Sequence, residues 1–457
     1  MPKREHVASG PARTDPPWLL RRLGSLLMRT LASEGFQSAS RAAAEVRRRV
    51  TGSRHRVDYF HRVDDPYGHL AVQLVPRLAA AYDIEIVCHL CGPAERANEP
   101  EPALLADYAR RDSADIAPHY GLVFPADAPV PSADDVALAE RCLAAAEPGE
   151  FATRAYEVGQ ALWAGGASLG PVAERFGPTS PEAALAARRA GTELRAKLGH
   201  YSGAMFHYGG EWYWGVDRAH HLERRFAGLG IARPGAAVPI APRPSVQPGA
   251  QRSAGGITLQ FFPSLRSPYT AVVYDRVLEL AERTGVTLEL LPVLPMVMRG
   301  VPATFAKGRY IFSDAAREAR TDGVPYGKVV DPIGEPVERA FALFPLARER
   351  GLGAEWLGSF LRAAFAEGID TSRDAGLRTV VERVGLSWDD ALEQLASGDG
   401  WRDELEVNRQ ALYEELGLWG VPSFRVRGPE GWPDLATWGQ DRLWLVAAEL
   451  RARIADR

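Results

Sequence analysis

The chain has 457 residues, which is too many for one ordinary hydrophobic core, so two or three domains are expected. Its composition, 46% hydrophobic and 25% charged, is typical of a soluble globular protein, and its net charge of −4 gives no general reason to expect nucleic acid as a partner. No apolar run reaches the roughly 18 residues of a membrane span, and no apolar segment with a small-residue cleavage site opens the chain. Three cysteines cannot make a disulfide framework, which predicts a reduced, cytoplasmic protein.

Residues 1–55 are predicted to form a basic helical extension. Residues 1–56 carry 12 Lys and Arg against 4 Asp and Glu, and Trp18 to Leu31 can form a basic amphipathic helix. One interpretation is a surface helix packed on the domain that follows. The other is attachment to an anionic membrane surface or to a partner.

A proline- and glycine-rich segment, residues 233–256, divides two stretches of similar pattern and is predicted to be a linker. On each side a short apolar run and a turn precede a Pro-Tyr pair that opens an amphipathic helix. Five identical pairs share a spacing of 202 residues: Pro66 and Pro268, Tyr67 and Tyr269, Tyr108 and Tyr310, Asp112 and Asp314, Gly121 and Gly323. The sequence therefore predicts a duplicated domain, with copies at 56–232 and 257–457.

The second copy gives the clearest order of elements. A buried strand and a helix are followed by a second strand at the spacing of a parallel βαβ unit, and then by a long helical segment, a strand and a closing helix. These are expected at Leu259 and Phe261, from Pro268, from Val286, from Ser313 to about Ser397, at Gly420–Val426, and from Thr437. This order predicts an α/β chain of two tandem thioredoxin-like domains, each with an inserted helical subdomain.

Four motifs in this order carry a specific resemblance. They are Ser267-Pro268-Tyr269, Lys307-Gly308-Arg309-Tyr310 followed by Asp314, Gly420-Val421-Pro422-Ser423-Phe424, and Trp438-Gly439-Gln440-Asp441-Arg442. Over about 190 residues the second copy resembles the DsbA-like thioredoxin family, within it the branch of 2-hydroxychromene-2-carboxylate isomerase and the kappa-class glutathione transferases. The resemblance implies glutathione, or another low-molecular-weight thiol, as cofactor.

Ser267 is the candidate catalytic residue. It stands just before Pro268, at a predicted helix start where free backbone N–H groups and the helix dipole favour an anion. A thiol bound there would be shifted toward its thiolate, with the Ser267 hydroxyl as hydrogen-bond donor. Redox members of the family have a cysteine at this position, so the sulfur here must come from a ligand. Ser267 also suits a plain helix N-cap, and the two roles share one geometry.

Val421-Pro422 resembles the family's cis-proline loop. A cis bond would present the backbone N–H and C=O of Val421 to an extended peptide such as the cysteinyl part of glutathione. A trans proline at a strand start is the alternative.

Four further residues follow from the resemblance as cofactor-binding candidates. Gln440 and Asp441 would orient the γ-glutamyl amine. Arg442 would be either a structural ion-pair partner or a carboxylate contact. Lys307 would face the glycyl carboxylate or an anionic substrate, or else be a solvated surface residue.

The first copy departs from the motifs at the same places. Asp65 replaces Ser267, and its carboxylate would repel a thiolate. Leu105 replaces Lys307, Gly203-Ala204 replaces Val421-Pro422, and Val216 replaces Gln440. The first copy is therefore expected to be a degenerate, non-catalytic domain.

The resemblance thus implies a glutathione-dependent isomerase or transferase acting on an unsaturated aromatic carbonyl substrate, and the duplication predicts that the two copies pair as an internal pseudo-dimer. No metal site, nucleic-acid partner or membrane span is expected. The alternatives are a non-catalytic binding or scaffold protein and, more remotely, a thiol–disulfide oxidoreductase. Cys88-His89-Leu90-Cys91 looks like a redox motif, but it ends the second strand instead of opening the first helix, and a zinc site there would need further ligands.

Overall fold

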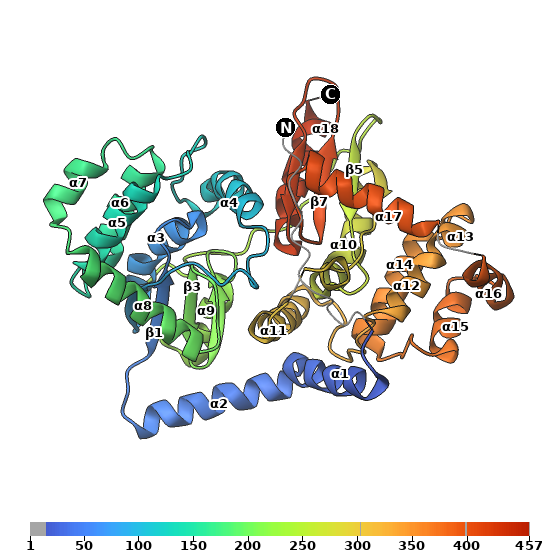
Figure 1. Cartoon of the computed structure of the whole chain (residues 1–457), viewed down its shortest axis with the longest axis horizontal. Helices are drawn as coiled ribbons and strands as arrows, with labels where there is room; N and C mark the ends of the chain where they lie inside the picture. The colour runs from blue at the N-terminus through green and yellow to red at the C-terminus, as the bar shows by residue number, and fades with distance from the viewer. Residues whose placement is uncertain (1–14, 302, 398–399, 457) are drawn as a thin grey trace. The chain divides into compact units, whose positions relative to one another are not determined.

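The computed structural model describes residues 15–301, 303–397 and 400–456. The chain divides into two compact units. The first unit is residues 38–244, and the second unit is residues 1–37 together with 245–457. Figure 1 shows the elements of both units.

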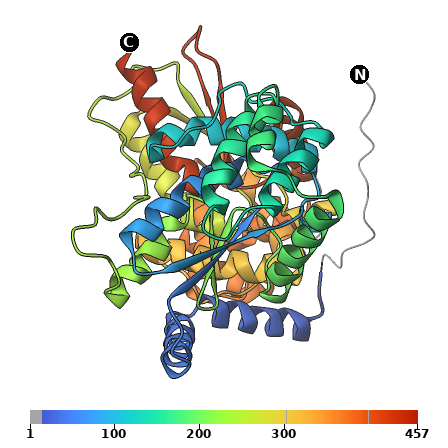
Figure 2. The same ribbon diagram turned by 90° about the vertical axis from the view of Figure 1, so that its left-hand side faces the viewer.

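The first unit contains a four-stranded sheet and helices inserted between its second and third strands. Its elements are most of α2 (Glu34–Val50), β1 (Arg56–His61), α3 (Pro66–Ala81), β2 (Glu85–Leu90), α4 (Pro102–Ile116), the 3-10 turn η1 (Ala117–Tyr120), α5 (Ala133–Ala144), α6 (Phe151–Trp163), α7 (Leu169–Phe176), α8 (Pro181–Lys197), β3 (Met205–Tyr208), β4 (Glu211–Trp214) and α9 (Ala219–Leu229). Figure 2 shows the inserted helices in cyan to green.

The second unit repeats this order after an N-terminal helix. Its elements are α1 (Trp18–Ala32), β5 (Thr258–Phe262), α10 (Pro268–Thr284), β6 (Thr287–Leu290), η2 (Met296–Arg299), α11 (Phe305–Asp322), α12 (Glu335–Ala342), α13 (Phe344–Glu349), α14 (Gly353–Arg362), the π-helical η3 (Ala363–Glu367), α15 (Asp374–Arg383), α16 (Trp388–Ala396), α17 (Trp401–Gln410), the π-helical η4 (Ala411–Glu415), β7 (Ser423–Arg427), β8 (Leu435–Trp438), η5 (Gln440–Arg442) and α18 (Leu443–Ala455). The stretch predicted from Ser313 to Ser397 is thus divided among separate helices.

The two sheets have the same topology. The strand orders are β2-β1-β3-β4 and β6-β5-β7-β8. In each sheet the first pair is parallel and the other two are antiparallel. The register is also equivalent, because Phe60 pairs with Met205 and Phe262 pairs with Ser423. The predicted α/β fold of two thioredoxin-like sheets, each with an inserted helical subdomain, is confirmed.

A matched hydrogen bond ties equivalent helices together in both units. The Tyr67 hydroxyl donates to Asp112 at 2.8 Å, and the Tyr269 hydroxyl donates to Asp314 at 2.8 Å. Asp112 and Asp314 are 2% and 1% exposed, so each carboxylate depends on such partners. In both units this bond joins the helix after the first strand to the helix after the second.

The end of the second copy differs from the sequence-based expectation. A closing helix was expected from Thr437, but Leu435–Trp438 is a strand, β8, and α18 begins only at Leu443. The strand is short and pairs along β7, where Ser423 faces Trp438. Cross-strand pairing has overridden the local helical pattern at this position.

The N-terminal helix also differs from expectation. We expected Trp18 to Leu31 to pack on the domain that follows in sequence, yet α1 belongs to the second unit and packs against α11. The buried Arg21 donates to the backbone oxygens of Asp331 and Ile333, and Ser25 accepts from the Asp331 N–H at 3.0 Å. The helix therefore presents polar side chains to its own unit. Among the described residues, none of the helices has the length and hydropathy of a membrane span.

Candidate functional site

The helix that positions the candidate site is α10. Ser267 has an extended backbone conformation and accepts the Thr270 N–H at its side chain, at 3.2 Å, while Pro268 occupies the first helical turn. Proline is tolerated there because its missing N–H would have no partner. At the other end, Gly285 adopts a φ of 68°, as a C-cap glycine does. Ser267 therefore stands at the N-terminus of a 17-residue helix.

The loop before β7 reaches this helix start. The Val421–Pro422 peptide bond is cis. The Ser267 hydroxyl donates to the Val421 carbonyl oxygen at 3.3 Å, which is long for a hydroxyl donor. Within the described part of the chain, the Val421 N–H has no hydrogen-bond acceptor. The structure thus brings Val421 and Pro422 close to Ser267, as the sequence-based prediction required.

Gly420 allows this loop to lie under an aromatic ring. A Cβ atom at Gly420 would overlap the indole of Trp438, which belongs to β8. Trp438 also packs against Trp419, with ring centroids 4.9 Å apart. Two tryptophans therefore flank the cis-proline loop.

Two cations meet at Trp419. Lys307 is only 8% exposed, and its Nζ lies 5.4 Å from the centre of the Trp419 ring, a cation–π contact. Arg299 donates to the Trp419 backbone oxygen at 3.1 Å and to the Tyr413 hydroxyl at 3.3 Å, and burial lowers its pKa. Trp419 is 3% exposed, and its Nε1–H has no hydrogen-bond partner in the described chain.

The three candidate residues of η5, Gln440, Asp441 and Arg442, differ in burial and in hydrogen-bond partners. Gln440 is 2% exposed and donates to the fully buried Glu318 at 2.6 Å, while its Oε1 has no partner among the described residues. Asp441 keeps 21% of its side chain exposed. Arg442 is 3% exposed and lies 3.7 Å from the Asp441 carboxylate. Of the three, Asp441 alone has the exposure to meet a ligand.

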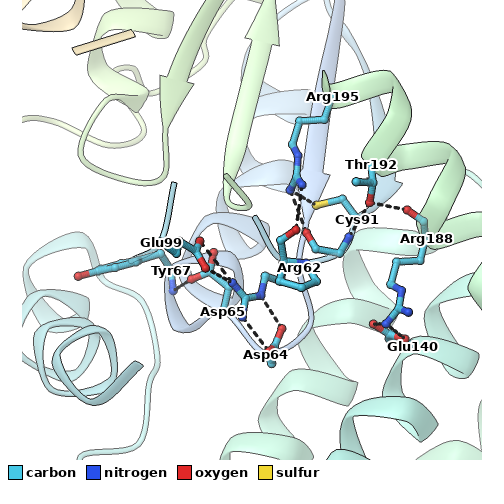
Figure 3. A network of polar contacts seen from close by, with 12 residues as sticks. Arg62, Asp64, Asp65, Tyr67, Cys91, Glu99, Glu140, Arg188, Thr192 and Arg195 are labelled. Carbon is cyan, nitrogen blue, oxygen red and sulfur yellow. Dashed lines mark hydrogen bonds and ion pairs between the residues drawn. The ribbon is translucent and has the colours of Figure 1, made fainter. Parts of the chain in front are cut away.

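The corresponding corner of the first unit is a network of charges, shown in Figure 3. Asp65 caps α3 by accepting the Tyr67 N–H at 3.0 Å. Burial raises the pKa of Asp65 to about 6, opposed by the positive charge of Arg62 and assisted by the negative charges of Glu99 and Asp64. A second negative charge, such as a thiolate, is therefore disfavoured beside Asp65.

The loop that replaces Val421-Pro422 also has another shape. Ala204 has a φ of 55°, the one positive φ of a residue other than glycine in the described chain. A Cβ at Gly203 would lie 3.0 Å from the Asp65 carboxylate and 2.8 Å from the Arg62 Cβ, so only glycine fits against this network.

A cleft of about 440 Å³ opens beside this corner of the first unit. Its charged lining is already paired: Arg62 contacts Asp64 at 2.7 Å, and Arg188 contacts Glu140 at 3.0 Å. An anionic sulfur would have to displace a carboxylate here.

The three cysteines all lie in the first unit. None of the three forms a disulfide bond. Burial raises the pKa of Cys88 to about 12 and that of Cys91 to about 11. Cys91 contacts Arg195 at 3.2 Å. Thiols of this kind are poor nucleophiles at neutral pH.

A family model agrees with the fold of the second unit. Residues 258–451 match the model of the DSBA-like thioredoxin domain. No curated protein matches the chain. Among solved structures, a 2-hydroxychromene-2-carboxylate isomerase is 19% identical, with 43% of this chain and 95% of that chain covered and a TM-score of 0.36. The cytosolic disulfide reductase DsbM from Pseudomonas aeruginosa is 20% identical, with 44% and 97% covered and a TM-score of 0.35. A likeness of this degree does not extend to activity.

Sequence reasoning missed Trp419, Arg299 and Glu318. Trp419 directly precedes the Gly420-Val421-Pro422 motif, so its position was the available signal. Arg299 and Glu318 reach the site from distant parts of the sequence, and no local pattern marks them.

Proposed function

We propose that the second unit is a glutathione-dependent isomerase or transferase that acts on an unsaturated aromatic carbonyl substrate. The observation that carries the proposal is the meeting of Ser267, at the start of α10, with the cis Val421–Pro422 loop. The resemblance of the four motifs to the isomerase and kappa-class branch supplies the substrate class. When bound, glutathione would supply the nucleophilic thiol.

The residues around Ser267 suit a thiol ligand. The N-terminus of α10 favours negative charge, and the hydroxyl of Ser267 could turn from Val421 to a bound sulfur because its present bond is long. The Val421 N–H can donate to a peptide carbonyl of the ligand. These groups orient the sulfur and hold it as thiolate, which requires no nucleophile from the protein.

The aromatic and basic residues beside the loop suit an unsaturated substrate with negative charge. Trp419 and Trp438 offer flat apolar surface, and Lys307 and Arg299 place positive charge next to Trp419. The unpartnered Nε1–H of Trp419 is a buried donor, and a ligand oxygen would satisfy it. Asp441 is our candidate for the γ-glutamyl amine, with Gln440 and Arg442 supporting its position from buried sites.

We propose that the first unit, with Asp65 in place of Ser267, does not bind the thiol. Its buried cysteines also offer little support for a thiol–disulfide oxidoreductase. A binding protein without catalysis is the remaining alternative.

Calorimetric titration of reduced glutathione into the full chain tests the proposal. We expect one site per chain, binding that weakens in Ser267→Ala by about tenfold, as loss of a charge-assisted hydrogen bond would cause, and unchanged binding in the matched first-unit variant Asp65→Ala. Absence of binding at millimolar glutathione, or equal weakening in both variants, would reject the thiol site and favour the non-catalytic alternative.

A further inference from the structure

Helix α1 turns its leucines away from the unit on which it packs. Five leucines of α1 are between 43% and 61% exposed: Leu19, Leu20, Leu23, Leu26 and Leu27. At 100° per residue they fall on one continuous arc of the helix, while Arg21, Ser25 and Ala32 fall on the opposite arc and are buried. A helix that is held to its unit by polar side chains and exposes a continuous apolar face is typical of an interaction surface. We call these five residues the leucine face.

The inward face fixes the helix firmly. Arg21 bonds to the backbone of Asp331 and Ile333, Ser25 bonds to the Asp331 N–H, and Arg29 donates to the Val329 oxygen at 2.7 Å. Turning the leucines inward would break these bonds and leave backbone groups unpaired. The leucine face is therefore held outward by the fold of the second unit.

The charged residues of helix α1 itself are all positive. Helix α1 contains Arg21, Arg22 and Arg29 and no acidic residue. Arg22 and Arg29 are exposed at one border of the leucine face, and Arg22 lies over the Trp18 ring at 5.4 Å. Leucine and tryptophan beside arginine is the composition of helices that lie in the interface of an anionic lipid bilayer.

We propose that the leucine face of α1 docks the protein on an anionic membrane surface, with the leucines in the acyl boundary and Arg22 at the lipid phosphates. A second copy of the chain is a poorer occupant. Symmetric pairing of two α1 helices would bring like charges together, and five leucines fall short of the 20 to 30 residues per side, about 800 Å², of a standard interface. The helix is peripheral, since it lacks the length to span.

Co-sedimentation of the full chain with phosphatidylglycerol vesicles and with phosphatidylcholine vesicles tests this docking. We expect binding to the anionic vesicles only, and about tenfold weaker binding for Leu23→Glu, because one half-exposed leucine leaves the apolar contact and a charge enters it. Arg22→Glu should weaken binding as well, and added salt should do the same. Val407→Glu is the matched control, because Val407 is an exposed apolar residue of the second unit outside α1, 62% exposed.

Two results would overturn the docking. One is equal sedimentation with both kinds of vesicle or with neither. The other is a lipid-free dimer, measured by light scattering, that Leu23→Glu converts to monomer, since the leucine face would then be covered by a second copy.

Discussion

The hydroxyl of Ser267 lies 3.3 Å from the carbonyl oxygen of Val421, across 154 residues of sequence. This contact joins the start of α10 to the cis-proline loop, and it uses the hydrogen that a bound thiolate would need. The same hydroxyl accepts the Thr270 N–H at 3.2 Å. Ser267 therefore has a capping role, which is visible in the structure, and a proposed role toward a ligand, and the two can be separated by substitution.

The capping role predicts a modest loss of stability. Ser267→Ala should lower the free energy of unfolding of the second unit by about 1 kcal/mol, whereas Ser267→Gly should cost only a few tenths, because glycine is the better N-cap of the two. Denaturant unfolding of the three proteins measures this. Since both variants lack the hydroxyl, glutathione binding that fell in Ser267→Ala alone would trace to the cap and not to the ligand contact.

Replacing Gly420, which lies under Trp438, should lower the free energy of unfolding more than replacing Ser267. Gly420→Ala would place a methyl group within the Trp438 indole, so the ring or the loop must move, at about 1–3 kcal/mol. We expect a lower unfolding midpoint and weaker thiol binding. Gly308→Ala, in α11 at a position where a Cβ meets nothing within 4 Å, is the control and should be neutral or slightly stabilising. Wild-type stability in Gly420→Ala would contradict the packing described.

Replacing the carboxyl group of Asp65 should stabilise the first unit at neutral pH but not at acid pH. In the folded chain the pKa of Asp65 is about 6, above its ordinary value of 3.8, so ionising this carboxyl group destabilises the fold. The loss of stability begins as the pH rises above 3.8 and is complete above about pH 6. Asp65→Asn keeps the cap and should stabilise the first unit by about 1–3 kcal/mol near pH 7.5 but hardly at all near pH 3.5. Unfolding at both pH values measures the difference. The exposed Asp107→Asn should show no such dependence, and a pH-independent effect of Asp65→Asn would refute the assignment.

Two buried histidines predict acid sensitivity in the same unit. His61 and His69 are 3% and 1% exposed, and burial lowers their pKa values to about 4 and about 3. The unfolded chain binds protons from about pH 6.5 downward and the folded chain does not, so their contribution is present above pH 6.5 and lost as the pH falls toward these values.

His69→Gln should therefore flatten the acid side of the stability curve, by about 2–4 kcal/mol between pH 6.5 and pH 3. Denaturant unfolding across this range is the measurement. The exposed His119→Gln serves as control. An acid slope that is unchanged in His69→Gln would show that other groups govern it.

The sequence predicted the features that depend on local pattern. The helix start at Ser267-Pro268 and the order of elements each follow from a few adjacent residues, and the cis-proline loop at Val421–Pro422 was expected from the resemblance. The features it missed depend on distant partners. β8 exists because Leu435–Trp438 pairs along β7, Gln440 turns toward Glu318 122 positions away, and α1 is oriented by backbone groups of residues 329–333. Periodicity alone would have placed the leucines of α1 inward.

The most direct test of the thiol site is the ionisation of glutathione bound to the protein, followed by the ultraviolet absorbance of the thiolate as pH is varied. An unperturbed thiol has a pKa of about 8.5, and the site at Ser267 should lower that of the bound thiol by about one unit or more, with a smaller shift in Ser267→Ala. A bound thiol that titrates as free glutathione does, in the wild-type chain, would contradict the central claim that the start of α10 and Ser267 stabilise a thiolate.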